Sequence, residues 1–182
     1  LKYIVAVRRT DLFFFMKYKP YLKSLGDDFI KDAEKVVFLS PVHREKAIDI
    51  FSSYISEEDF RKKSYVIPNG IDEIYHEQIA QAKTIIENKV NLVFIGKVTD
   101  KNKNVDTIIK VADKMKADGW HIRLKLIGDT TEEFQKNIKD KPYIISLGRL
   151  TPQEITNSLK EDDISIMPSF TETFGLVYVE AM

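Results

Sequence analysis

The sequence lacks cysteine, an excess of charge of either sign, and any long hydrophobic run. Without cysteine there is no disulfide and no cysteine-ligated metal, and a reducing cytoplasm fits the composition. The 28 lysine and arginine residues balance 28 aspartate and glutamate residues, so no long-range field attracts nucleic acid. No apolar run approaches the roughly 20 residues that span a bilayer. These absences predict a cytoplasmic globular protein that does not bind nucleic acid.

Short apolar segments alternate with helix-prone segments along the chain. The expected strands are residues 2–7, 36–39, 64–67, 91–95, 122–127, 143–147 and 163–168. One helix is expected to begin at about residue 20, and others to cover 41 to about 54, 104–118 and 131–140. A further helix is expected to begin at residue 152, because Thr151 and Glu154 form a capping box in front of it. This alternation is typical of βαβ units and predicts a doubly wound α/β fold with parallel sheets.

The chain divides into two expected lobes. Residues 73–90 are polar and helix-prone, and we interpret them as a connector between residues 1–72 and residues 91–182. Within the second lobe, Gly119 is expected to close the helix before it, and the strand 122–127 alternates as a half-buried strand would.

Loops at the carboxyl ends of the second-lobe strands are the candidate binding sites, because ligands of open parallel sheets bind there. The loop after residue 95 carries Gly96 with Lys97, Lys101 and Lys103. A glycine that allows close approach and several amines suit an anionic phosphate. A solvated, lysine-rich turn is the alternative. Gly128 and Asp129, after the next strand, are expected to be a turn.

A third loop lies in the final segment, PSFTETFGLVYVEAM. Gly175 stands at a plausible helix start, so the N–H groups of Gly175 and Leu176 could face a diphosphate. Glu172 in the loop and Glu180 in the helix could accept hydrogen bonds from sugar hydroxyls. The alternatives are an acidic helix start followed by an apolar core helix, or a strand over residues 176–179.

Five segments in their order resemble one enzyme family. They are VIPNGID, NLVFIGKVTDKNKNVDTIIKVA, LKLIGD, ISLGRLTPQEI and DISIMPSFTETFGLVYVEAM. The sequence resembles the group 1 (family four) retaining glycosyltransferases of the GT-B fold, closely over 64–182 and more loosely before. The resemblance implies two Rossmann-type lobes, both incomplete in this chain. Residues 1–72 would be the carboxyl-terminal part of the acceptor-side lobe, and 91–182 the nucleotide-sugar-binding lobe, truncated at its end.

The resemblance assigns roles residue by residue. Glu172 matches the catalytic-site glutamate at the donor sugar, and Glu180 matches the glutamate that holds the ribose hydroxyls. The remaining donor-binding positions are Gly96, Lys97, Lys103, Phe174, Gly175 and Leu176.

Two departures from the family pattern stand out. Lys97 occupies a place that is usually arginine, so the charge is kept and the bidentate fork is lost. Arg8 and Arg9 stand where many relatives have His-Gly, and they could face the cleft or form a surface pair. We expect the three histidines, His43, His76 and His121, to lie at the surface or in helix caps. Residues 10–18 contain three consecutive phenylalanines, and we expect them to pack in the core or between the lobes rather than to contact a membrane.

The resemblance implies transfer of a sugar from a nucleotide donor to a glycan or lipid-linked acceptor with retention, in cell-surface polysaccharide synthesis. It implies no metal or other cofactor, and UDP is favoured over GDP. A sugar-nucleotide epimerase or a non-catalytic nucleotide-sugar-binding module is the alternative. We interpret the chain as a middle piece of a longer protein, inactive by itself and prone to self-association through sheet edges. The full-length protein would work in the cytoplasm, with peripheral contact at the inner face of the membrane.

Overall fold

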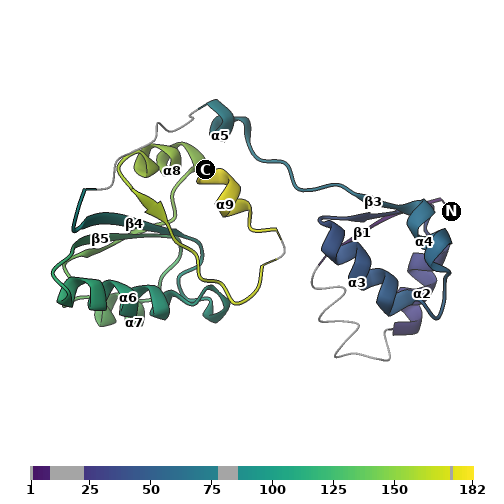
Figure 1. Ribbon diagram of the computed structural model, residues 1–182, viewed down its shortest axis with the longest axis horizontal. Coiled ribbons are helices and arrows are strands. Elements are labelled where there is room, and N and C mark those ends of the chain that lie inside the picture. Colours follow the sequence, from purple (N-terminus) through teal and green to yellow (C-terminus); the bar gives the residue numbers. More distant parts are fainter. Residues whose placement is uncertain (1, 9–22, 78–85, 173) are drawn as a thin grey trace. The chain divides into compact units, whose positions relative to one another are not determined.

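The computed structural model describes residues 2–8, 23–77, 86–172 and 174–182. The chain forms two compact units, Leu1–Gly70 and Ile71–Met182. Both contain parallel sheets flanked by helices, which confirms the α/β prediction (Figure 1). Within the described residues, no helix is long and apolar enough to cross a membrane.

The first unit is built on a parallel sheet of three strands in the order β1-β2-β3. They are β1 (Ile4–Val7), β2 (Lys35–Phe38) and β3 (Ser64–Val66). The helices are α2 (Lys23–Asp32), α3 (Pro41–Phe51) and α4 (Glu57–Lys63). Phe38, Phe51 and Phe60 are at most 1% exposed and form the centre of the core. Burial of large apolar side chains such as these contributes about 1.5–3 kcal/mol each.

Helix termini in the first unit follow local sequence signals. Ser40 caps α3 by accepting a hydrogen bond from the backbone N–H of His43. His43 is only 6% exposed, so the expectation of a surface histidine is wrong, whereas its backbone N–H does take part in the cap. Residue 43 lies on the face of α3 that packs on the sheet, as do Ala47 and Phe51.

Helix α4 was not predicted, although Ser56 caps it and an acidic first turn precedes a basic last turn.

The second unit is built on a parallel sheet in the order β6-β5-β4-β7. The strands are β4 (Lys89–Ile95), β5 (His121–Ile127), β6 (Ile144–Gly148) and β7 (Ile164–Ser165). The helices are α5 (Glu73–Glu77), α6 (Val105–Ala117), α7 (Glu132–Asn137), α8 (Pro152–Leu159) and α9 (Leu176–Glu180), with a 3₁₀ turn, η3, at Lys101–Lys103. Helices α6 and α7 cover one face of this sheet, whereas α8 and α9 lie on the other (Figure 1).

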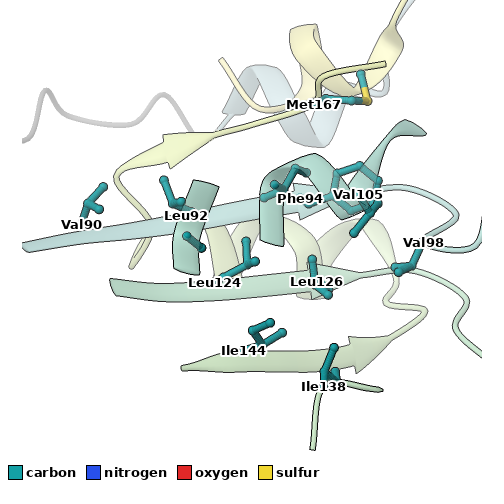
Figure 2. Close-up of a cluster of buried hydrophobic side chains, with 12 residues drawn as sticks. Val90, Leu92, Phe94, Val98, Val105, Leu124, Leu126, Ile138, Ile144 and Met167 are labelled. Carbon is teal, nitrogen blue, oxygen red and sulfur yellow. The ribbon is translucent and has the colours of Figure 1, made fainter. Parts of the chain in front are cut away.

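The main core of the second unit lies between the sheet and helix α6. Figure 2 shows Leu92 and Phe94 of β4 beside Leu124 and Leu126 of β5, all in one cluster with Val105 at the start of α6. Helix α6 ends as expected: Gly119 has φ +90°, and the N–H groups of residues 119 and 120 return to the last turn. The capping box that opens α8 is also present.

Two expectations for this sheet are wrong. Strand β5 is not half-buried, because Leu124, Lys125, Leu126 and Ile127 are all buried. It is an interior strand with helices on both faces, and parallel strands in that position lose the polar face that alternation predicts. The last strand is also shorter than predicted. Strand β7 covers only Ile164–Ser165. The N–H of Ile166 still donates to the carbonyl oxygen of Val93, and Pro168, two residues further on, has no N–H to donate.

Candidate functional site

Three neighbouring strands of the second unit end at glycines with positive φ. The angles are +152° at Gly96 after β4, +139° at Gly128 after β5 and +69° at Gly148 in β6. A Cβ atom on Gly128 would lie 1.9 Å from the carbonyl oxygen of Gly96, so this crossing admits no side chain. Gly128 therefore has a packing role beyond the turn that the sequence predicts. The three glycines thus lie at the carboxyl ends of neighbouring strands of the sheet.

Two predicted site residues meet above these strand ends. Lys103, in η3, places its Nζ 2.5 Å from Oε1 of Glu172. The two residues are 69 positions apart in the chain, and their side chains keep 20% and 27% of their exposure. The Lys103 stem also lies over Gly96, with its Cε 3.9 Å from where a Cβ would stand. Gly96, Lys103 and Glu172 thus form one cluster that solvent still reaches.

Helix α9 begins beside this cluster. Gly175 is its N-cap residue with φ +71°, and a Cβ there would lie 2.6 Å from the Tyr178 ring. The Tyr178 hydroxyl donates to the carbonyl oxygen of Met167 at 2.5 Å, and the Met167 sulfur is 3.9 Å from Lys103 Nζ. The predicted helix start is therefore confirmed, and the alternative strand over 176–179 is wrong. Phe174 and Leu176, on either side of Gly175, are half-buried.

Glu180 lies at the carboxyl end of α9. Burial raises the pKa of its carboxyl group above the usual value. Tyr75 in α5 lies close enough to feel this charge: burial, then the charges of Glu180 and Asp72, raise the pKa of its hydroxyl. A half-buried carboxylate whose solvation is incomplete is suited to accept hydrogen bonds from a ligand.

The remaining predicted residues are not part of this cluster. Lys97 is exposed on the loop after β4. Arg8 is exposed after β1 in the first unit. Arg9 and the segment 10–18 lie outside the described residues. His76 lies in α5, and His121 is exposed at the start of β5.

Sequence reasoning missed the polar residues that hold the cluster together. Asn102 makes hydrogen bonds to Phe170 and Thr171, and Tyr178 ties α9 to the segment before Glu172. The only signal in the sequence is the position of Asn102 directly before Lys103. Across the described ranges, no group of three or more histidine, aspartate or glutamate side chains could hold a metal ion.

The sequence profile of the family described as glycosyl transferases group 1 matches residues 89–182, just over half of the chain. The chain belongs to this family. Among curated proteins, it is 32% identical over 129 residues to a 41.2 kDa protein in the cps region of Klebsiella pneumoniae, covering 66% of this chain and 34% of that protein. It is 24% identical over 176 residues to the alpha-monoglucosyldiacylglycerol synthase of Streptococcus pneumoniae, covering 88% and 38%.

Solved structures agree on the fold. The chain is similar to Anabaena Alr3699/HepE in complex with UDP-glucose, with a TM-score of 0.64 and 15% identity over 98% of this chain and 50% of that one. This likeness confirms the predicted GT-B-like fold. The chain spans about a third of the length of the curated relatives that it matches.

Proposed function

We propose that the protein containing this chain transfers a sugar from a nucleotide donor to a glycan or lipid-linked acceptor, with retention of configuration as in family four. The observation that carries the proposal is the ion pair of Lys103 and Glu172 above Gly96. It puts a cation and a carboxylate side by side at the sheet edge where parallel α/β folds bind ligands. In a nucleotide-sugar donor the diphosphate and the sugar are likewise directly bonded neighbours, so the cation could bind the first and the carboxylate the second.

The roles follow from the charges. Lys103 would bind the diphosphate and neutralise charge on the leaving group, aided by the N–H groups of Gly175 and Leu176. Lys97 would add a second cation to the same phosphates. The Glu172 carboxylate would then accept hydrogen bonds from the sugar, and the Glu180 carboxylate from the ribose hydroxyls. Phe174 would line the donor beside Gly175.

This arrangement differs from that of a glycosidase. Glycosidases use two carboxylates across one bond as acid and nucleophile, or as acid and base. Here the carboxylate proposed to lie at the sugar has a lysine as its neighbour in the free chain, so the site brings a phosphate-binding cation to the donor where a glycosidase brings a second carboxylate. We propose that the acceptor attacks from the face that the diphosphate leaves, and that lysines and N–H groups make a metal ion unnecessary.

The donor base and the acceptor are proposed from the relatives. The solved relative named above contains UDP-glucose, which favours UDP over GDP as the nucleotide here. The named activity of the Streptococcus pneumoniae relative involves a glycosylated diacylglycerol, and the Klebsiella pneumoniae relative is from a cps region. Both favour cell-surface polysaccharide or glycolipid synthesis, with the whole protein acting in the cytoplasm at the inner face of the membrane.

The chain alone is proposed to bind donor, whereas transfer is proposed for the whole protein, because the chain covers only 34% and 38% of its curated relatives. Arg8 is proposed to meet a phosphate or an acidic acceptor there. Self-association through the strand edges is a separate proposal, and size-exclusion chromatography that shows only monomer would contradict it.

The proposal is tested by calorimetric titration of this chain with UDP and with GDP. We expect one nucleotide, UDP, to bind, and Glu180→Ala to weaken it by at least tenfold. The matched control is Glu132→Ala, which removes an exposed glutamate from the first turn of α7. Equal affinities in wild type and Glu180→Ala, or no binding of either nucleotide to the wild type, would contradict the proposed donor site.

A further inference from the structure

We infer that Asn102 is a positioning residue, which fixes the segment 168–172 and so aims the Glu172 carboxylate at the donor sugar. The inference rests on the proposed donor role of Glu172. Asn102 itself is not expected to touch the donor. It acts through Thr171, the residue immediately before the glutamate.

Asn102 and residues 170–171 are joined by three hydrogen bonds. The side-chain Nδ2 of Asn102 donates to the carbonyl oxygen of Thr171 at 2.8 Å, and its Oδ1 accepts from Thr171 Oγ1 at 2.7 Å. The backbone N–H of Phe170 donates to the carbonyl oxygen of Asn102 at 2.9 Å. One amide thus satisfies both the main chain and the side chain of Thr171, which fixes a loop segment that lies in no sheet.

Asn102 is itself held firmly. Its backbone N–H donates to Oδ1 of Asp100 at 2.9 Å, and the N–H of Lys103 donates to the Asp100 carbonyl at 2.8 Å. On the other side, Asn104 adopts φ +55° and its Nδ2 donates to the carbonyl oxygen of Pro168 at 3.4 Å. Three consecutive residues, 102–104, therefore hold the five-residue segment 168–172 at its start, its middle and its end.

The ion pair with Lys103 cannot by itself place Glu172 during catalysis. Both side chains are long and lose rotamer freedom when they pair. A bound diphosphate also competes for Lys103, so the glutamate gives up this partner when the donor arrives. The Asn102–Thr171 contacts involve no group that the donor needs, and they persist. Asn102 is therefore the residue that keeps Glu172 in place when Lys103 binds phosphate.

The test separates sugar recognition from nucleotide recognition. Wild type, Asn102→Ala, Thr171→Val and the double variant are titrated with UDP and with UDP-glucose, or with GDP and GDP-mannose if GDP is the nucleotide that binds. The matched control is Asn157→Ala, which removes an exposed asparagine of α8. We expect Asn102→Ala to weaken the nucleotide-sugar about tenfold while the nucleotide stays within twofold, and the control to change neither.

Two further readouts sharpen the result. The double variant should bind the sugar nucleotide as Asn102→Ala does, because the hydroxyl bond that Thr171→Val removes is one of the two side-chain hydrogen bonds that Asn102→Ala already removes. Hydrogen exchange of the peptide that contains 168–172 should rise about tenfold in Asn102→Ala, with an unchanged unfolding midpoint.

Three outcomes would overturn the inference. Equal weakening of nucleotide and nucleotide-sugar would show a merely structural role. Unchanged affinities or unchanged exchange would show that Asn102 does not hold the segment. A wild type that binds none of the four probes would overturn the donor site itself and, with it, the positioning role.

Discussion

Two lysine–carboxylate pairs lie in the same unit and differ in what surrounds them. Lys125 Nζ lies 3.2 Å from Asp162 Oδ2 beneath α8, and the two side chains keep only 7% and 2% of their exposure. Lys103 and Glu172 approach to 2.5 Å at the sheet edge and keep 20% and 27%. The Lys125 ammonium also donates to the backbone oxygen and the hydroxyl of Ser158, at 3.0 and 3.1 Å.

The difference shows which pair can change partners. A buried ion pair is held by the cost of leaving either charge unpaired without water, so Lys125 and Asp162 serve to fasten α8 to the sheet. A half-open pair is partly solvated, and a ligand with more charge can displace one member. Lys103 and Glu172 are therefore suited to exchange, and Lys125 and Asp162 are not.

The largest expected effect comes from breaking the buried pair. Lys125→Met removes the cation that lies 3.2 Å from the buried Asp162 carboxylate, and we expect a loss of about 3–5 kcal/mol in the free energy of unfolding. Urea denaturation measures it. The matched control is Lys141→Met, whose Nζ lies 2.7 Å from Asp113 with side chains 29% and 41% exposed. That change should cost about 1 kcal/mol or less. Similar losses in both variants would remove the distinction between buried and open pairs.

Breaking the partly exposed pair of Lys103 and Glu172 should change stability little and nucleotide binding strongly. Lys103→Met should change the free energy of unfolding by less than about 1 kcal/mol, because the pair is partly solvated. It should weaken UDP by about 10- to 100-fold, or roughly 1.4–2.8 kcal/mol, through loss of a charge-assisted phosphate contact. Calorimetry and urea denaturation of one preparation measure both. Lys101→Met, an exposed lysine of the same turn, is the control. Unaltered UDP binding would rule out Lys103 as a phosphate ligand.

Removing only the charge of Glu172 tests whether this carboxylate and the phosphates compete for Lys103. Glu172→Gln keeps the shape of the side chain and releases Lys103 from its partner. UDP should therefore bind about two- to fivefold more tightly, a gain of roughly 0.4–1 kcal/mol, and transfer by the whole protein should fall. Titration with UDP at low and moderate salt checks the first part. Weaker UDP binding in this variant would mean that Glu172 supports the phosphate site instead of competing for it.

The smallest effect concerns a carboxylate that is half-buried. The pKa of Glu180 is raised in the folded chain, so its stabilising contribution is present below the usual value of 4.5 and is lost as the pH rises through the folded pKa. Glu180→Gln removes the charge. Its melting temperature should exceed that of the wild type by on the order of 1 °C at pH 7 and match it near pH 4. A difference that grows on acidification would contradict this sign.

Much of the fold could be predicted from the sequence, because short-range signals carry it. Pro152 and the Thr151–Glu154 capping box open α8, and Gly119 closes α6, as expected. The position of Gly175 also located the start of α9. These features depend on residues within one helical turn of each other, where local hydrogen bonds and φ preferences decide the outcome.

The site was predicted less completely. The glycine, lysine and glutamates were identified by resemblance, but nothing local indicated that Lys103 pairs with Glu172 or that Asn102 holds Thr171. Each of these contacts joins residues 69 positions apart. They form only when two loops at the carboxyl edge of one sheet come together. Patterns in a single sequence do not show which residues that far apart in the chain lie close together in space.

The sequence by itself determined the α/β class, most of the alternation of strands and helices, the starts of α3, α8 and α9 and the end of α6, because periodicity and capping act within a few residues. Only the tertiary structure decided which charges are buried and which stay open. The sequence shows Lys125 and Lys103 alike as lysines among apolar and polar neighbours. Helix α8 covers the face of β5 that carries the first, whereas the second lies in η3 beside the carboxyl edge of the sheet, where its side chain keeps 20% of its exposure and solvent still competes for its charge.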